Sequence, residues 1–173
     1  MKSTREAENE PSLYRDMPWC LIIVAVIAGD HWVKHMVVEQ LAAGESRPVF
    51  DGWFSLTYLR NTGAAFSLFR NHTSVLTVVT AAVLVLLLIY VIRHRHGHPA
   101  CLTALSLVIG GGIGNLIDRA ARGYVVDMFD FHFFPVFNVA DICVVAGCIL
   151  LAVYALFLAG RPRRRRRTAG RSR

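Results

Sequence analysis

The chain has 173 residues, and 54% of them are hydrophobic, a larger apolar share than a soluble globular domain usually carries. The mean hydropathy is +0.44, and the formal net charge is +7, with eight arginines in the C-terminal stretch RPRRRRRTAGRSR alone. This composition excludes an ordinary soluble domain and indicates a membrane protein whose basic residues gather at its end.

Four apolar segments are long enough to cross a membrane. A helix needs about 20 apolar residues to span the hydrocarbon core, and each segment approaches that length. The alternating pattern of barrel strands is missing from the sequence, and only helices and closed barrels satisfy their own backbone in lipid. We therefore predict an all-α membrane protein with four transmembrane helices at about 18–38, 73–92, 100–119 and 139–159.

The helices form one predicted membrane domain over 17–160, between a polar tail at 1–16 and an Arg-rich tail at 161–173. The first helix follows basic residues, as a signal peptide does, but no clear small-residue cleavage site precedes its polar end at DHWVKH. We therefore expect it to be a retained anchor.

The distribution of Lys and Arg predicts the orientation. Most of the 19 basic residues lie in the N-terminal tail, in the loop RHRHGH after the second helix, and in the C-terminal tail. The positive-inside rule places these three regions in the cytoplasm, so segments 39–71 and 120–138 face outward. The Arg run could also bind nucleic acid, but behind a multi-span anchor we favour a topology signal that meets anionic headgroups and expect no nucleic-acid partner.

The outward segment after the first helix predicts a small β-rich and amphipathic element outside the cytoplasm. WFSLTYLR, at 53–60, alternates as a short strand does. NTGAAFSLF, at 61–69, reads as a turn leading into an amphipathic surface helix. In the third helix, Gly110 and Gly114 form a G-x-x-x-G pair that permits close helix approach.

Metal or cofactor chemistry has little support in the sequence. The cysteines lie inside predicted helices without a C-x-x-C pair. The histidines of HWVKH lack the glutamate of a zinc-binding H-E-x-x-H helix, and no third ligand is evident. We expect no metal and no cofactor.

Polar side chains within membrane segments are costly, so they are usually paired or functional. A set of them falls near the outer helix ends on three of the predicted helices, which favours a site at one depth. Asp30 and Lys34 are spaced i,i+4 and can pair on one helix face. The set comprises Asp30, Lys34, Asn115, Asp118, Arg119, Asp127, Asn138 and Asp141.

Asp127 and Asp141 each sit at a predicted junction between loop and helix, and the stretch DFHFFPVF between them could bring them together. Two adjacent carboxylates share a proton, a state that suits peptide hydrolysis. The alternative is a helix N-terminal charge at Asp141 and an ordinary loop residue at Asp127. Spacing alone slightly favours this alternative. A small transporter or ion-binding protein, or a scaffold without chemistry, also remains open, although the polar set stays at one edge rather than lining the whole depth.

Five motifs in order resemble the lipoprotein signal peptidase (signal peptidase II) family. They are DHWVK from Asp30, NTGAAFS from Asn61, GGIGNLIDR from Gly111, VVDMFDF from Val125 and FNVAD from Phe137. The resemblance implies a bacterial inner-membrane aspartyl peptidase with both termini cytoplasmic and its site near the periplasmic face. Such an enzyme removes the signal peptide of a prolipoprotein by cleaving before a cysteine that carries diacylglycerol.

The resemblance also implies roles for residues. The catalytic dyad corresponds to Asp127 and Asp141, which reverses the preference drawn from spacing. Residues matching the motif beside the substrate are Asn61, Gly63, Ala64 and Phe66, and those matching the supporting positions are Asn115, Asp118, Arg119 and Asn138. The implied partners are a lipidated prolipoprotein, membrane lipid and an inhibitor of the globomycin type, and we expect a monomer.

Overall fold

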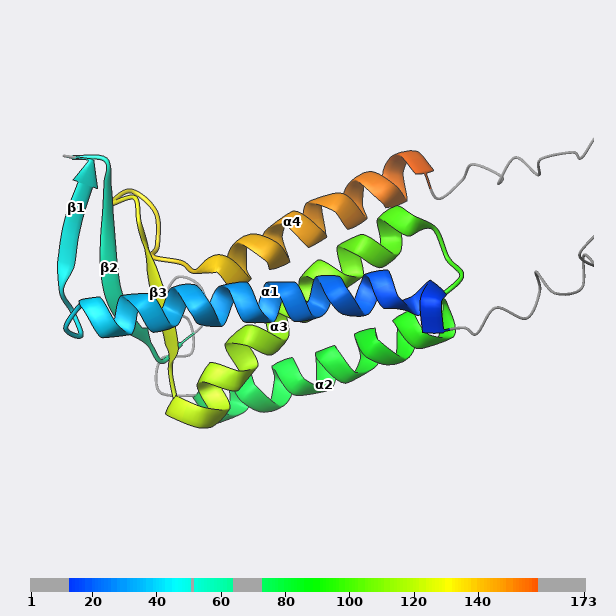
Figure 1. Ribbon diagram of the computed structural model, residues 1–173, viewed down its shortest axis with the longest axis horizontal. Helices are drawn as coiled ribbons and strands as arrows, with labels where there is room; N and C mark the ends of the chain where they lie inside the picture. Colours follow the sequence, from blue (N-terminus) through cyan, green and yellow to red (C-terminus); the bar gives the residue numbers. More distant parts are fainter. Residues whose placement is uncertain (1–12, 51, 64–72, 159–173) are drawn as a thin grey trace, which may run out of the picture.

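Four helices run lengthwise and a small sheet lies across one end of them (Figure 1). The computed structural model describes residues 13–50, 52–63 and 73–158. The helices are α1 (Leu13–Gln40), α2 (Thr73–Arg93), α3 (Pro99–Arg122) and α4 (Val139–Val153), and α4 continues as a π-helical turn at Tyr154–Leu158. The strands β1 (Ser46–Phe50), β2 (Phe54–Asn61) and β3 (Val125–Asp130) form an antiparallel sheet in that order.

The prediction of four membrane-length helices is confirmed. Four helical stretches in the described part of the chain are long and apolar enough to cross a membrane. Large apolar side chains on α2 and at the end of α4 point outward, including Leu86 and Leu156, which are 66% and 77% exposed. Outward apolar faces of this kind suit lipid rather than water.

The third helix is longer than predicted, because it ends at Arg122 rather than near 119. Gly123 has a φ of 77°, a left-handed conformation that glycine adopts without a Cβ clash, and its N–H bonds the carbonyl of Arg119. The extra turn keeps Asp118 and Arg119 within regular helix, where their side chains are firmly positioned.

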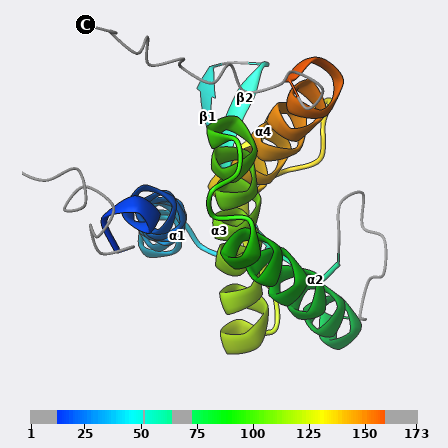
Figure 2. The same ribbon diagram turned by 90° about the vertical axis from the view of Figure 1, so that its right-hand side faces the viewer.

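α3 is the central helix and contacts the other three (Figure 2). Gly110 and Gly114 both face α1: a Cβ on Gly110 would lie 2.9 Å from Val26 Cβ, and one on Gly114 would lie 2.8 Å from Asp30 Oδ2. The predicted close approach through this glycine pair is therefore confirmed.

The predicted strand at 53–60 is confirmed as β2, at Phe54–Asn61. The placement of Asp127 at a loop–helix junction was wrong, because Asp127 lies inside β3, opposite Leu59 of β2. On one side of the sheet Val126, Met128 and Tyr58 pack against Val37 of α1. The amphipathic helix was predicted within 61–69, and residues 64–69 of that stretch lie outside the described residues.

The two ends of the helix bundle differ in character (Figure 1). The start of α1, the α2–α3 connection and the end of α4 lie at the end opposite the sheet. Segments 41–50, 52–63 and 123–138 lie at the sheet end, so the described parts of the regions predicted to share a side lie together.

Candidate active site

Asp127 projects from β3 and is 1% exposed. Its Oδ1 accepts a hydrogen bond of 2.6 Å from Asn138 Nδ2, and its Oδ2 accepts one of 2.8 Å from Asn61 Nδ2. The pKa of Asp127 is raised to about 7. Burial is the largest cause and the neighbouring charge of Asp141 adds to it, while the amide donors of Asn61 and Asn138 and the charge of Lys34 act in the opposite direction. This carboxyl group can therefore hold a proton near neutral pH.

Asp141 lies in the first turn of α4 and takes part in a capping box with Asn138. The backbone N–H of Asp141 donates to Asn138 Oδ1 at 2.9 Å, and the backbone N–H of Asn138 donates to Asp141 Oδ2 at 3.2 Å. Asp141 Oδ1 accepts a hydrogen bond of 2.8 Å from Asn115 Nδ2. The helix-cap alternative thus describes the backbone of Asp141 correctly, yet the carboxylate also faces the cavity.

The amide orientations of the three asparagines follow from their partners. Asn61 Oδ1 accepts from the backbone N–H of Gly63 at 2.9 Å. Asn115 Oδ1 accepts from Lys34 Nζ at 3.0 Å and from Asn138 Nδ2 at 3.1 Å. An oxygen must face each of these donors, so every Nδ2 group is directed at a carboxylate. Each of the four carboxylate oxygens of the aspartate pair therefore accepts one N–H.

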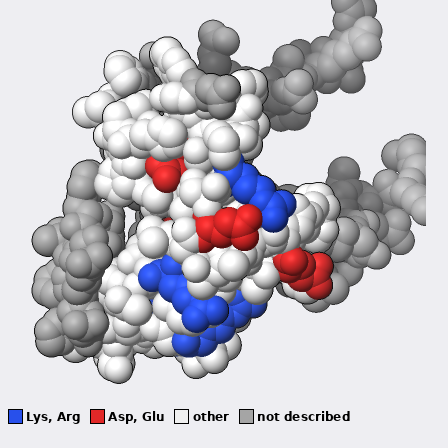
Figure 3. All heavy atoms as spheres, turned by 90° about the vertical axis from the view of Figure 1, so that its left-hand side faces the viewer, with Lys and Arg blue, Asp and Glu red and all other residues white. Residues whose placement is uncertain are grey.

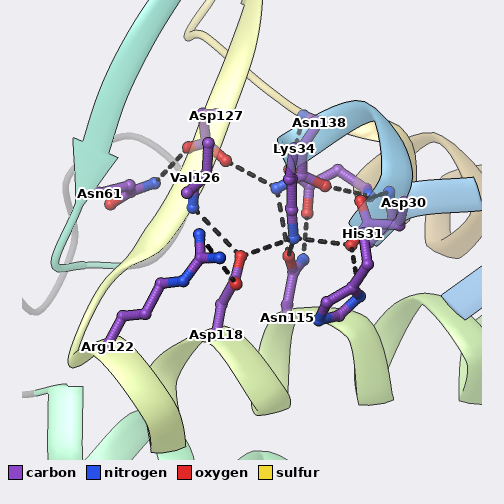
Figure 4. A network of polar contacts seen from close by, with 12 residues as sticks. Asp30, His31, Lys34, Asn61, Asn115, Asp118, Arg122, Val126, Asp127 and Asn138 are labelled. Atoms are coloured by element: carbon purple, nitrogen blue, oxygen red, sulfur yellow. Dashed lines mark hydrogen bonds and ion pairs between the residues drawn. The ribbon is translucent and has the colours of Figure 1, made fainter. Parts of the chain in front are cut away.

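Lys34 forms the centre of a buried ionic network between α1, α3 and the aspartate pair (Figure 4). Its Nζ lies 2.7 Å from Asp30 Oδ2 and 2.8 Å from Asp118 Oδ2, which confirms the predicted i,i+4 pair and adds a second partner. Lys34 and Asp30 are both 0% exposed. Charges this deeply buried are tolerable only when paired and hydrogen-bonded.

The same network fixes the elements that carry the aspartates. Asp30 Oδ1 accepts the backbone N–H of Ala140 in the first turn of α4 at 2.9 Å. Asp118 Oδ2 accepts the backbone N–H of Val126, next to Asp127 in β3, at 3.3 Å. α1 and α3 therefore position both aspartates through their backbones as well as through Asn115.

Arg119 lies beside the pair with unused hydrogen-bonding capacity. Its Nη2 donates to the carbonyl of Gly63 at 3.4 Å. Its Nε is buried and has no hydrogen-bond partner among the described residues. Ala64 and Phe66, the other residues of that motif, lie outside the described residues.

Both aspartates line a cavity of about 570 Å³. Its floor is polar and its walls are apolar, and sequence reasoning missed the apolar residues. On α4 four of the five are spaced i, i+3, i+4 and i+7 from Ile142, a detectable signal for one helix face beside Asp141, and Val144 is the fifth. The apolar lining comprises Val125, Phe134, Pro135, Val136, Phe137, Ile142, Val144, Val145, Ala146 and Ile149.

The structure thus brings together ten of the twelve site residues named from the sequence. In the part of the chain that the structure describes, no three His, Cys, Asp or Glu side chains are placed to hold a metal ion. The polar groups brought together here are four carboxyl groups, three amides, a lysine and an arginine, and two of the carboxyl groups, those of Asp127 and Asp141, line the cavity.

Residues 22–157 match the family described as signal peptidase (SPase) II. The chain belongs to the signal peptidase II family. It is therefore a peptidase, and neither a transporter nor a scaffold without chemistry is supported by the comparisons.

Relatives and solved structures agree with this assignment. A lipoprotein signal peptidase of Clostridium acetobutylicum is 41% identical over 140 residues, which cover 78% of this chain and 91% of the relative. One of Brevibacillus brevis is 40% identical over 150 residues, covering 86% of this chain and 100% of the relative. A bacterial membrane enzyme solved by the in meso method at 2.3 Å resolution is 30% identical with a TM-score of 0.76, covering 80% of this chain and 87% of that one. The signal peptidase II fold therefore spans nearly the whole described bundle.

Proposed function

We propose that this signal peptidase II is an aspartyl endopeptidase that cleaves diacylglyceryl-modified prolipoproteins just before the lipidated cysteine. Asp127 and Asp141 are the catalytic residues. The names of the relatives support the substrate class. The observation that carries the assignment of the dyad is that Asp127 and Asp141 line one cavity, where the Asn138 side chain donates to the Asp127 carboxylate and accepts the backbone N–H of Asp141.

The hydrolysis needs one protonated and one ionised carboxyl group. Asp127 suits the protonated role, because burial raises its pKa to about 7. Asp141 suits the ionised role, because it lies in the first turn of α4, where the helix dipole favours a negative charge, and one of its two donors is a backbone N–H of that helix start. Asp141 takes a proton from a water held between the two groups, while Asp127 donates its proton to the scissile carbonyl.

Collapse of the resulting tetrahedral intermediate transfers a proton to the leaving amine and restores the shared-proton state. Arg119 has a buried Nε–H without a partner in the described part of the chain, and we assign it to a carbonyl oxygen of the substrate. We assign the hydrogen bonds that hold the two carboxylates to the side chains of Asn61, Asn115 and Asn138. The backbone around the carboxylates is held by the ionic network of Asp30, Lys34 and Asp118. The segment beside the peptide contains Gly63, Ala64 and Phe66.

The cavity matches a lipidated peptide in its distribution of polarity. Its polar floor carries the dyad, and the apolar face of α4 leads away from Asp141 through Val145 to Ile149. We assign that face to the acyl chains, and a cyclic peptide inhibitor of the globomycin type would occupy the same cavity. The dyad and the residues assigned to support it form a site that needs no second copy of the chain, and we propose that the enzyme acts as a monomer.

We also propose that the sheet end faces the periplasm from the bacterial inner membrane. The opposite end of the bundle carries the α2–α3 connection with Arg93 and Arg95, the start of α1 and the end of α4. The basic tails follow directly in sequence from those two helix ends, and the positive-inside rule places such regions in the cytoplasm. The dyad then meets the substrate's cysteine near the outer interface. Periplasmic labelling of a cysteine introduced at Glu45, but not at His96, would support this orientation.

The dyad is tested with Asp127→Asn and Asp141→Asn, purified in detergent and given a lipidated precursor. Each variant should insert normally and lose about 10²-fold to 10⁴-fold of the cleavage rate, because general acid–base catalysis contributes on that order. Asp130→Asn is the matched control, since Asp130 lies in the same strand outside the cavity lining, and should retain full activity.

Retained cleavage by either Asp127→Asn or Asp141→Asn contradicts the dyad. Equal cleavage of a precursor that lacks the diacylglyceryl group contradicts the substrate assignment, and this second result leaves the dyad standing.

A further inference from the structure

A second cluster of polar and aromatic residues lies at the sheet end, on the side of the sheet away from Asp127. Arg60 Nε donates to the hydroxyl of Tyr58 at 3.2 Å, and that hydroxyl lies 3.3 Å from the hydroxyl of Tyr124. The Arg60 guanidinium stacks over both rings, with its central carbon 5.4 Å and 5.1 Å from the two ring centres. These contacts hold an exposed arginine in a defined orientation.

The cluster offers several hydrogen-bond donors and contains no carboxylate. The terminal nitrogens of Arg60 donate to none of the described residues, and no carboxylate within that part of the chain forms an ion pair with Arg60. The tyrosine pair has two hydroxyl hydrogens and uses one of them between its oxygens. Both observations describe a site that suits an anion.

Arg122 adds a second positive charge to the same place. It ends α3 two residues before Tyr124, with its side chain exposed. Its nearest carboxylate is that of Asp118, 3.8 Å away, and Lys34 already lies 2.8 Å from Asp118. The negative charge of Asp118 is therefore largely balanced by Lys34. Arg60 and Arg122 carry positive charge that no nearby carboxylate of the described residues balances.

Figure 3 looks onto this end of the molecule and shows two groups of basic side chains, a larger one low on the face and a smaller one higher up beside acidic side chains. The exposed basic residues among those described at this end are Arg47, Arg60 and Arg122. Arg47 lies 2.8 Å from Glu45 and is thereby neutralised, which leaves Arg60 and Arg122 as the uncompensated pair.

The depth of the cluster identifies the anion. Arg122 is the last residue of α3, and Pro99–Arg122 is one of the four stretches able to cross a membrane. Arginine and tyrosine at the end of such a span lie at the level of the lipid headgroups. A phosphate diester at that level meets two guanidinium groups, which bind phosphate oxygens well.

We propose that Arg60, Arg122, Tyr58 and Tyr124 form a binding site for the headgroup of an anionic phospholipid. This site is separate from the cavity of the dyad, because none of the four residues lines that cavity. It would hold the sheet and the end of α3 at a fixed depth in the bilayer.

The test measures binding of a fluorescent phosphatidylglycerol to the full-length protein in a nonionic detergent. Arg60→Gln and Arg122→Gln should each weaken binding at this site about fivefold, and the double variant about 25-fold. Arg47→Gln is the matched control, an exposed arginine on β1, and should bind as the parent does. The C-terminal arginines are present in every variant, so differences from the parent report on this site. Melting temperatures equal to the parent's show that the variants are folded.

Two competitors identify the ligand. Phosphatidylcholine, whose headgroup carries a compensating positive charge, should displace the probe poorly, and millimolar inorganic phosphate should not displace it. Unchanged binding by the double variant overturns the proposal, as does equal weakening by Arg47→Gln. Displacement by inorganic phosphate overturns the lipid assignment and identifies a site for free phosphate.

Discussion

Asn138 donates a hydrogen bond of 2.6 Å from its side-chain amide to Asp127 Oδ1. The carbonyl oxygen of the same side chain accepts the backbone N–H of Asp141 and caps α4. One residue therefore has two separable tasks: an acceptor that starts a helix, and a donor that orients a buried carboxyl group.

Two substitutions separate these tasks. Asn138→Ser keeps an N-cap oxygen but loses the donor to Asp127, whereas Asn138→Ala loses both. We expect both variants to lose at least about tenfold in kcat, because a misplaced catalytic group is costly. Only Asn138→Ala should also lose about 1 kcal/mol of unfolding free energy through the missing cap. Cleavage assays and thermal unfolding in detergent measure the two effects. An active Asn138→Ser variant would show that the amide donor is dispensable.

The pH dependence of activity should have an alkaline limb set by Asp127. Because burial raises the pKa of Asp127 to about 7, the protonated form required of the acid disappears above that pH. We expect kcat/KM to fall about tenfold per pH unit beyond it. The apparent value belongs to the coupled pair rather than to one residue. A profile of the purified enzyme that stays flat to pH 9 would contradict this role, and Asp130→Asn should leave the limb in place.

The same raised pKa predicts how stability depends on pH. The unfolded chain releases the proton of Asp127 near pH 4, whereas the folded protein keeps it until about pH 7. Between these values the folded state binds more protons, so its unfolding free energy falls as pH rises, by about 4 kcal/mol in total. Asp127→Asn removes this term. Relative to that of the parent, the unfolding free energy of Asp127→Asn should therefore increase as the pH is raised from 4 to 8, as measured by denaturation in detergent. Parallel curves for the two proteins would show that Asp127 is ionised in the fold.

Much of the fold follows from short-range features of the sequence. Apolar length predicted the four helices, alternation predicted β2, and the high cost of buried charge singled out residues such as Asp30, Lys34 and Asp118. The motifs, rather than the spacing, identified Asp127 and Asp141 as a pair.

The remaining features depend on contacts between distant segments. VVDMFD is a short apolar run, which periodicity cannot distinguish from a helix end, and it becomes β3 by pairing with β2 about 65 residues earlier. The roles of the Asn61 and Asn115 amides depend on which donor meets each oxygen, and no local pattern encodes that. The apolar wall beside Asp141 had a helical spacing but belonged to a helix that is apolar on every side.

Lys34 should be essential to the fold because it neutralises two buried carboxylates. Lys34→Met leaves Asp30 and Asp118 without their shared cation, and breaking a buried ion pair in this way costs about 3–5 kcal/mol. Adding Asp118→Asn to Lys34→Met removes one uncompensated charge and should recover part of the loss. His35→Gln, an exposed change one residue along α1, serves as the control. A Lys34→Met variant as stable as the parent in thermal unfolding would show that the carboxylates are protonated or solvated.

Gly114 should not tolerate even one additional methyl group. A Cβ there would lie 2.8 Å from Asp30 Oδ2, and that carboxylate cannot move away easily because Lys34 and the N–H of Ala140 hold it. We expect Gly114→Ala to cost about 1–3 kcal/mol of stability, as overpacking does, and to lower cleavage by displacing Asp30 from the first turn of α4.

Gly29→Ala is the matched control, since a Cβ at Gly29 meets nothing within 4 Å. It should be neutral or stabilise α1 by up to about 1 kcal/mol, because alanine favours helix over glycine. Equal unfolding temperatures and cleavage rates for the two variants would mean that α1 and α3 are not in close contact at Gly114, and that the ionic network can shift without affecting the dyad.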